Sequence, residues 1–126
     1  MIAYLDTNAV IRLSIGGKPR LSRETSRLIE EGELRISPMV LLELELLNEI
    51  RRIKYLASDL QSKIEHELGV HVCDLPFAPI ASAALYEKWT RDPFDRIIVA
   101  HAKINGLAPL ISSDEKIAAH YPRTIW

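Results

Sequence analysis

The sequence predicts a three-layer α/β/α sandwich built on a mainly parallel sheet of four or five strands. Three times along the chain, a helical pattern ends at a glycine and a short β-prone run follows within a few residues, at Gly32, Gly69 and Gly106. This joint is typical of an alternating α/β fold, because glycine readily adopts the left-handed conformation that ends a helix. The first apolar run, residues 2–5, is almost continuous, as expected for a strand covered on both faces.

The elements follow from these joints and from helix start signals. Strands are expected at residues 2–5, 34–36, 70–73, 107–111 and 123–125. Helices are expected at residues 7–15, 23–31, 38–53, 56–68, 79–89 and 93–105, with a short one after Asp114. Ser22 and Ser37 are suited to cap the helices that follow them, and Pro38 fits the first position of its helix. Since no linker-like segment or internal repeat interrupts the pattern, residues 1–126 are expected to form a single domain.

Composition excludes several classes of protein. The chain has 126 residues, of which 48% are apolar and 26% charged, so it has the composition of an ordinary globular domain rather than a disordered chain. The longest uncharged run, residues 75–86, contains two prolines and is too short to cross a bilayer. No basic stretch precedes the N-terminal apolar residues, and the single Cys73 excludes an internal disulfide. A cytoplasmic domain without membrane contact is therefore expected.

Acidic residues follow two of the predicted strands. Asp6 comes directly after residues 2–5, and Asp114 comes shortly after residues 107–111. Ligands of a parallel sheet bind beyond the carboxyl ends of its strands, where both carboxylates would project from the same edge. Each aspartate can equally be read as the cap of a following helix, because aspartate is a favoured residue there.

Glu43 is the acid that is hardest to explain by structure alone. Its neighbours at three and four residues along the expected helix are all apolar: Met39, Val40, Leu46 and Leu47. Glu45, by contrast, is expected to face water. A carboxylate in an apolar stripe loses several kcal/mol, roughly, unless it finds a partner. That partner could be a buried arginine or a metal ion.

The densest motif is the run from Arg91 to Arg96. Asp92 is a suitable cap with Pro93 at the first helical position, and Asp95 then occupies the third position, where a negative charge favours the helix dipole. The helix continues as an apolar run, residues 97–100, which is expected to bury it against the sheet. Because residues three apart are neighbours on a helix, Asp92 and Asp95 can both point into one site.

A cluster of these acids needs protons or a cation. Two like charges about 4 Å apart repel by roughly 4 kcal/mol at an effective dielectric of 20. Oxygen ligands without histidine or cysteine favour Mg²⁺ or Mn²⁺, and such ions support phosphodiester hydrolysis by a metal-activated water. If five acids share one pocket, the chain of net charge −1 keeps twelve other acids against sixteen basic residues. A mildly basic rim would suit a polyanionic substrate, although charges mixed evenly over the surface remain an equal alternative.

Four motifs together carry a resemblance to a known family. In chain order they are Leu5-Asp6-Thr7-Asn8, Ser37 with Glu43 on a leucine-rich helix, Asp92-Pro93-Phe94-Asp95-Arg96 with the apolar run after it, and Ser112-Ser113-Asp114. The ordered set resembles PIN domains, and specifically VapC-type toxins of type II toxin–antitoxin pairs, over essentially the whole chain. The resemblance implies a metal-dependent endoribonuclease that acts on RNA. It also implies a homodimer and an antitoxin protein whose tail enters the acidic site.

The resemblance further implies roles for individual residues. The residues that match the family's four catalytic acids are Asp6, Glu43, Asp95 and Asp114. Asp6 and Asp95 would be the principal ligands of Mg²⁺ or Mn²⁺, with the other two in support, and Asp92 is the alternative reading of the third acid. Asn8 and Ser112 match small polar positions that hydrogen-bond the carboxylates or the waters of the metal.

Basic and apolar residues outside the acid motifs suggest contacts with partners. Arg12, Arg91 and Arg96 are candidates to bind RNA phosphates near the rim of the site, or to remain solvated charges. The aromatic residues are expected to serve packing more than base stacking: Tyr4, Tyr86, Trp89 and Trp126. The leucine-rich helix from residue 38 is apolar on more than one face, so it is either fully buried or partly an interface.

Three other functions stay open. A phosphatase with an aspartyl nucleophile would need a second acid two residues after Asp6, where the chain has Asn8. A phospho-accepting receiver domain could use Asp74, but it would also need an acidic pair after the first strand and a lysine after the last. The remaining alternative is a PIN-like module that binds RNA or a partner with little catalysis.

Overall fold

The computed structural model describes all residues from 1 to 126, as five strands and seven helices. The strands are β1 (Ile2–Leu5), β2 (Glu33–Ile36), β3 (His71–Val72), β4 (Leu110–Ile111) and β5 (Thr124–Ile125). The helices are α1 (Thr7–Ser14), α2 (Arg23–Glu31), α3 (Pro38–Glu49), α4 (Ala57–Leu68), α5 (Phe77–Ala84), α6 (Pro93–Ile104) and α7 (Glu115–His120). None of these helices is both long enough and apolar enough to cross a membrane.

The five strands form one parallel sheet in the order β3-β2-β1-β4-β5. The register pairs Ala3 of β1 with Leu34 of β2 and Leu5 of β1 with Ile111 of β4. The chain therefore builds the sheet outward from β1 in one direction and then in the other, and the direction switches between β1 and β4. In such sheets the ligand crevice lies beyond the carboxyl ends of the strands at this switch. The predicted α/β class and its parallel sheet are confirmed.

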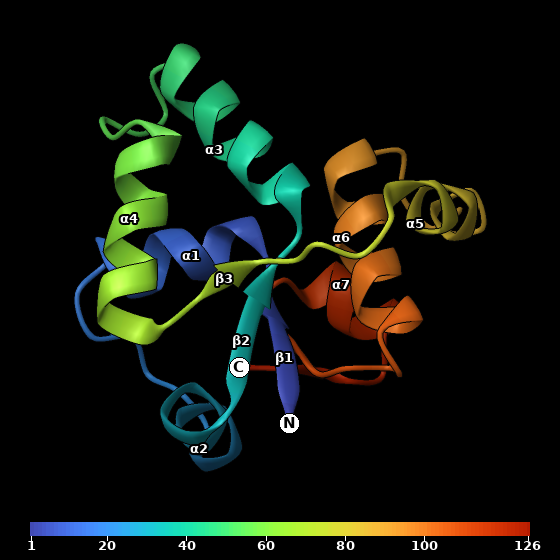
Figure 1. The fold of residues 1–126 in the computed structure, drawn as a ribbon, viewed down its shortest axis with the longest axis horizontal. Coiled ribbons are helices and arrows are strands. Elements are labelled where there is room, and N and C mark those ends of the chain that lie inside the picture. The colour runs from blue at the N-terminus through green and yellow to red at the C-terminus, as the bar shows by residue number, and fades with distance from the viewer.

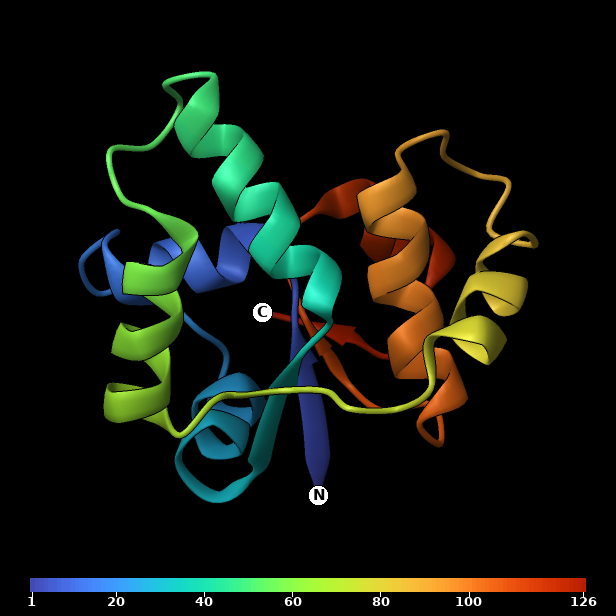
Figure 2. The same cartoon turned by 45° about the horizontal axis from the view of Figure 1, so that its top comes forward.

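Helices cover both faces of the sheet (Figures 1 and 2). In both views α1 and α4 lie on one side and α5 and α6 on the other. Helix α3 leaves the end of β2 and extends past the carboxyl ends of the strands, where it contacts α1, α4 and α6 (Figure 2). The central strands are fully covered, since Tyr4, Leu5, Leu110 and Ile111 have no exposed surface. This burial on both faces explains the continuous apolar runs in the sequence.

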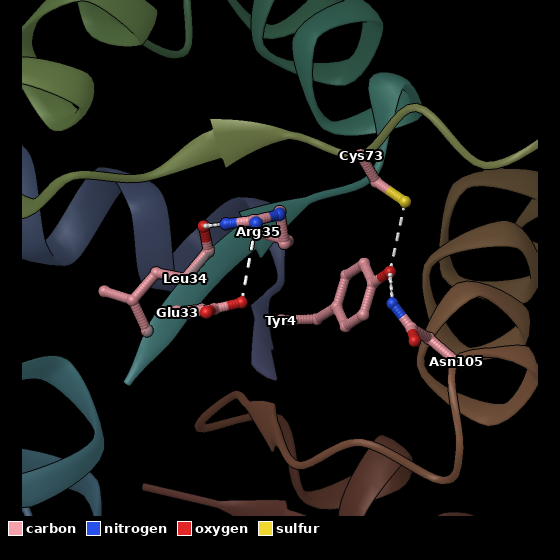
Figure 3. A network of polar contacts seen from close by, with 6 residues as sticks. All are labelled: Tyr4, Glu33, Leu34, Arg35, Cys73 and Asn105. Carbon is pink, nitrogen blue, oxygen red and sulfur yellow. Dashed lines mark hydrogen bonds and ion pairs between the residues drawn. The ribbon is translucent and has the colours of Figure 1, made fainter. Parts of the chain in front are cut away.

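Tyr4 anchors a buried polar network that ties three segments together (Figure 3). Its hydroxyl lies 3.1 Å from Cys73 Sγ and accepts a hydrogen bond of 2.8 Å from Asn105 Nδ2. Cys73 follows β3 and Asn105 follows α6, so both segments are fixed against β1. A buried phenol needs such partners, and burial raises the pKa of this one above its ordinary value. Tyr4 is therefore a packing residue, as expected, and its buried ring is not accessible for stacking with an RNA base.

Several elements are shorter than predicted, because left-handed residues or side-chain contacts interrupt them. Helix α3 stops at Glu49 instead of residue 53, since Arg51 adopts a left-handed conformation with φ of 62°. Helix α5 begins two residues earlier and ends five residues earlier than the predicted range 79–89. Its expected last turn instead buries Glu87, which binds Lys103 Nζ at 2.5 Å and Trp89 Nε1 at 2.7 Å. The strand predicted at 107–111 keeps only two residues, because Leu107 is also left-handed with φ of 54°.

Two of the glycine joints end helices for different reasons. Gly69 has φ of 67°, as the predicted left-handed helix end requires. Gly32 is extended, with φ of −84° and ψ of 169°, so the predicted left-handed conformation is wrong there. A Cβ at Gly32 would lie 2.6 Å from the carbonyl oxygen of Leu28 and 3.1 Å from that of Met1. Close approach of two backbone segments requires glycine at this joint.

Candidate active site

Five carboxylates surround one cavity beyond the carboxyl ends of β1 and β4. The cavity has a volume of about 210 Å³ and is lined by Asp6, Thr7, Asn8, Ile11, Glu43, Leu47, Asp92, Asp95 and Asp114. These side chains come from the starts of α1, α6 and α7 and from the middle of α3. No lysine, arginine or histidine lines the cavity. The fold thus gathers five acids, far apart in the sequence, without a basic side chain in their midst.

A larger cavity lies elsewhere and has a different character. It measures about 320 Å³ and lies between Met1 and α2, at the opposite end of the sheet from the acids (Figure 1). Its two carboxylates, Glu24 and Glu31, flank the basic Arg27. It therefore contains side chains of both charges, whereas the smaller cavity concentrates one sign of charge. We place the candidate site at the smaller cavity for this reason.

Asp6 is the most deeply buried acid of the site, with 4% of its surface exposed. It caps α1, since its Oδ1 accepts a hydrogen bond of 2.7 Å from the amide of Ala9. Its Oδ2 accepts a hydrogen bond from the buried hydroxyl of Ser112. Burial raises the pKa of Asp6 to about 6, and the charge of Asp114 adds to this effect, although both hydrogen bonds oppose it. Asp6 is therefore held in one orientation, and its ionised form is less favourable than that of an ordinary aspartate, so a cation nearby would stabilise it.

Asp114 lies at the start of α7 and is exposed. Its Oδ1 caps the helix by accepting hydrogen bonds from the amides of Lys116 at 2.8 Å and Ile117 at 3.0 Å. The Oγ of Ser112 accepts a hydrogen bond of 3.1 Å from the amide of Asp114 while its hydroxyl donates to Asp6. One serine thus links the two acids, and each acid both caps a helix and faces the cavity.

Asp92 and Asp95 differ in how their oxygens are used. Asp92 Oδ1 accepts hydrogen bonds from the amides of Phe94 at 2.8 Å and Asp95 at 3.3 Å, which is the expected cap of α6. The Asp95 carboxylate accepts no hydrogen bond from the protein. Burial raises the pKa of Asp95 to about 7, with further contributions from the charges of Asp92, Glu43, Asp114 and Asp6. Asp95 is therefore the less engaged carboxylate of the pair.

Glu43 is half-buried and forms no ion pair, so the buried arginine considered as its partner is absent. Burial raises its pKa, the nearby hydroxyl of Thr7 lowers it, and the charges of Asp92 and Asp6 raise it. Thr7 is itself buried, yet its Oγ1 has no partner in hydrogen-bonding geometry. Thr7 therefore lies close enough to Glu43 to lower its pKa but outside hydrogen-bonding geometry, so its hydroxyl can contact a water or a hydrated ion in the cavity. Thr7 belongs to the first acid motif, but the sequence by itself does not distinguish it as a residue of the site.

Glu45 differs from its expected exposure to water. It is half-buried, and its Oε1 accepts a hydrogen bond of 3.1 Å from the amide of Ala57, the first residue of α4. The residue before that helix, Leu56, has no side chain able to cap it. Glu45 therefore supplies from α3 the cap that α4 lacks.

The donor set of the cavity suits a hard divalent cation. Carboxylates predominate, with the amide of Asn8 and the hydroxyl of Thr7 beside them, and neither sulfur nor imidazole is present. No three of the acidic side chains are placed to coordinate one ion simultaneously. Mg²⁺ typically takes one or two carboxylates and keeps several waters. The arrangement therefore fits a hydrated ion better than an ion held in an all-protein cage.

The three candidate basic residues take up different positions around the site. Arg12, on the last turn of α1, donates a hydrogen bond of 3.2 Å to Ser113 Oγ, and its guanidinium lies 4.7 Å from the ring centroid of Trp126. Arg96 donates from Nε to the carbonyl oxygen of Thr90 at 2.8 Å, so it braces the loop before α6. Arg91 is exposed and forms no ion pair. None of the three lines the cavity itself.

Comparisons with known proteins point to one family. The model of the PIN domain family matches residues 3–121. The fold is similar to a toxin–antitoxin complex from Klebsiella pneumoniae, with 21% identity, a TM-score of 0.64, and coverage of 98% of this chain and 96% of that chain. It is also similar to VapBC2 from Rickettsia felis bound to a DNA fragment from their promoter, with 23% identity, a TM-score of 0.66, and coverage of 99% and 96%. A third similar structure is VapC20 from Mycobacterium tuberculosis, a toxin that cleaves the sarcin–ricin loop, with 21% identity, a TM-score of 0.64, and coverage of 98% and 99%. Among curated proteins, no sequence matches the chain.

Proposed function

The chain belongs to the PIN domain family, and from this premise we propose that it is a metal-dependent endoribonuclease acting as the toxin of a toxin–antitoxin pair. The observation that carries the proposal is the cavity lined by five carboxylates and no basic residue at the switch point of the sheet. Support comes from the similar structures, of which two are described as VapBC2 and a toxin–antitoxin complex and one as an RNA-cleaving toxin. The proposal takes residues 1–126 as one PIN-like domain, since a single sheet and one large core run through them.

We assign Asp6 and Asp95 as the principal ligands of Mg²⁺ or Mn²⁺. Their pKa values are raised to about 6 and about 7, so both carboxylates gain strongly from a neighbouring cation. Glu43 and Asp114 act as supporting acids. Asp92 is the alternative third ligand, but one of its oxygens already accepts two amide hydrogen bonds.

When bound, the ion would polarise a phosphodiester and activate water toward it. The chain's own groups then have separate tasks. Ser112 and the Ala9 amide hold the Asp6 carboxylate in a fixed orientation. Hydrolysis forms a P–O bond to the water oxygen, breaks the P–O bond to the leaving sugar oxygen and releases a proton from the water. We assign acceptance of that proton to the Glu43 carboxylate, because it lines the cavity, forms no ion pair and is not one of the principal metal ligands.

The proposed partners are RNA as substrate, a cognate antitoxin protein, and a second copy of the chain in a homodimer. The leucine-rich helix α3 is only partly buried, since Leu42 is 57% exposed and Leu46 is 39% exposed. This exposure leaves an apolar strip available to a partner, in keeping with one of the two alternatives drawn from the sequence. The receiver-domain alternative has less support, because Asp74 follows the edge strand β3 and does not line the acidic cavity.

The test is cleavage of a mixed set of labelled RNAs by the purified chain with Mg²⁺ or Mn²⁺. EDTA and the variants Asp6→Asn and Asp95→Asn serve as controls. We expect metal-dependent cutting that EDTA and each variant abolish. Cutting by either variant at the rate of the parent would overturn the site assignment. Metal-dependent binding of RNA without any cutting would favour the alternative of a binding module.

A further inference from the structure

The loop between α3 and α4, residues 50–56, concentrates positive charge on a short exposed turn. Arg51, Arg52 and Lys54 fall within four positions, and all three are exposed. None of them takes part in an ion pair. The nearest acids in the sequence, Glu49 and Asp59, lie on the two flanking helices. The three cations are therefore available to an anionic partner.

Arg51 occupies a backbone conformation that a glycine would adopt with less strain. Its φ of 62° places it in the left-handed region directly after the end of α3. Its amide bonds to the carbonyl of Asn48 at 2.9 Å, and the amide of Arg52 bonds to that of Leu47 at 2.8 Å. This pair of bonds defines the Schellman helix end, at which glycine is the usual residue. A strained non-glycine residue is a reason to look for a function of its side chain.

The loop is tied directly to the acidic cavity. Leu47 lines the cavity, and its carbonyl oxygen accepts hydrogen bonds from the amides of Arg52 at 2.8 Å and Ile53 at 3.3 Å. Figure 2 shows the loop at the same end of the molecule as the loop that precedes α6, whereas α2 lies at the other end. The loop that carries the cations is thus joined directly to a helix that lines the acidic cavity.

An exposed aromatic ring stands next to these cations. Tyr55 is 46% exposed, and Ile50 at the other end of the loop is 54% exposed. Cations that follow a phosphate backbone, together with an aromatic face on which a base can stack, are the usual features of single-stranded nucleic-acid binding. An acidic protein segment would also meet the cations, but it has no base to stack on the exposed ring of Tyr55. The features together favour RNA.

We propose that the loop of residues 50–56 is a second RNA-binding element, which grips the strand beside the scissile phosphate through Arg51, Arg52 and Lys54 and stacks a base on Tyr55. The proposal rests on the proposed nuclease function and adds to it the residues that bind the substrate outside the acidic cavity. The loop contributes to affinity for RNA strands long enough to reach it and leaves the chemical step to the carboxylates.

The test compares RNA binding by loop variants in an Asp6→Asn background, in which bound RNA is expected to stay intact. Fluorescence anisotropy of a labelled single-stranded RNA is measured for Arg51→Gly, for Arg52→Gln with Lys54→Gln, and for Arg27→Gln. The last variant removes one charge from the exposed surface of α2, at the far end of the molecule, and is the matched control. We expect the first two to weaken binding severalfold and the control to leave it unchanged. The slope of log K against log salt should become shallower by about 0.7 for each phosphate that the variant no longer binds.

Thermal unfolding and cleavage by the parent complete the test. Arg51→Gly should unfold at the same or a higher temperature, so its loss of RNA binding cannot arise from misfolding. Binding of RNA by both loop variants as tightly as by the background would overturn the proposal. The proposal would also be overturned if the loop variants bound RNA as before but lost affinity for polyglutamate, because the loop would then be a protein-docking surface. Absence of metal-dependent cutting by the parent chain is a separate result and overturns the nuclease function instead.

Discussion

The hydroxyl of Ser112 donates a hydrogen bond to Oδ2 of Asp6 and so joins the ends of β4 and β1, the two strands between which the sheet switches direction. The same oxygen of Ser112 accepts a hydrogen bond from the amide of Asp114. A serine without any acidic character thus sets the orientation of one carboxylate and the backbone position of another. The site depends on this link because the two acids come from opposite ends of the chain.

Replacement of Ser112 by alanine tests this link. We expect Ser112→Ala to raise the pKa of Asp6 further, since the hydrogen bond from Ser112 lowers it. The buried carboxylate would lose a donor, which typically destabilises a protein by about 1–3 kcal/mol. Urea unfolding and Mg²⁺ titration by calorimetry would show lower stability and weaker metal binding. Ser113→Ala, which removes only the half-buried acceptor of Arg12, is the matched control. Equal metal affinity in the two variants would contradict the role given to Ser112.

The metal-free protein should lose stability as the pH rises. Asp6 and Asp95 have pKa values of about 6 and about 7 in the folded chain, above the ordinary 3.8. A carboxyl group whose pKa is raised by folding leaves stability intact below pH 4 and reduces it progressively up to about pH 7. For the nearly fully buried Asp6, about two pH units correspond to about 3 kcal/mol. Urea unfolding in EDTA at pH 5 and at pH 8 measures the effect.

Two changes should remove this pH dependence. Saturating Mg²⁺ should restore stability at pH 8, because the ion favours the ionised carboxylates. Asp95→Asn should reduce the pH dependence in EDTA and leave the metal-free protein as stable or more stable at pH 8. The gain is expected to be smaller than for a fully buried group, since solvent screens a half-buried carboxylate. A metal-free protein that is more stable at pH 8 than at pH 5 would contradict the raised pKa values of these acids in the folded chain.

Glycine at the left-handed positions should stabilise the fold. Arg51 and Leu107 have φ of 62° and 54°, and a residue with a Cβ loses roughly 1–2 kcal/mol in this conformation. We expect Arg51→Gly and Leu107→Gly each to raise the free energy of unfolding by up to about 1 kcal/mol. The conformational entropy that glycine loses on folding offsets part of this gain. Chemical denaturation measures this gain. Only Arg51→Gly should also weaken RNA binding, so similar RNA affinities for the two variants would argue against the loop as an RNA-binding element.

The contact of Glu45 with α4 should be a measurable helix cap. Removal of its carboxylate leaves the amide of Ala57 without this acceptor, and loss of a cap destabilises by about 0.5–2 kcal/mol. We expect Glu45→Ala to lower stability by that amount without affecting cleavage. Glu49→Ala removes an exposed glutamate with no ion pair from the same helix and should change little. Equal stability of the two variants would exclude a capping role.

The sequence predicted the fold class and the starts of most helices, because both depend on local chemistry. Ser22, Ser37, Asp92 and Asp114 cap the helices that follow them, as their side chains and the residues after them indicate. The apolar run at residues 2–5 predicted a strand covered on both faces, as β1 is. The sequence also indicated the acids, since Asp6 and Asp114 follow strands, Asp92 and Asp95 begin a helix, and Glu43 interrupts an apolar stripe.

Only the tertiary structure decided how these pieces are used. Strand order brings Asp6 beside Ser112, leaves Thr7 buried without a partner, and gives Glu45 to the cap of another helix. It also ends α3 at Glu49 and leaves Arg51 exposed in a left-handed conformation. Capping and apolar periodicity act over a few residues, so a sequence reveals them directly. Burial, the pKa of a carboxyl group and the partner of a side chain depend on atoms brought together from distant segments, and these exist only once the sheet has formed.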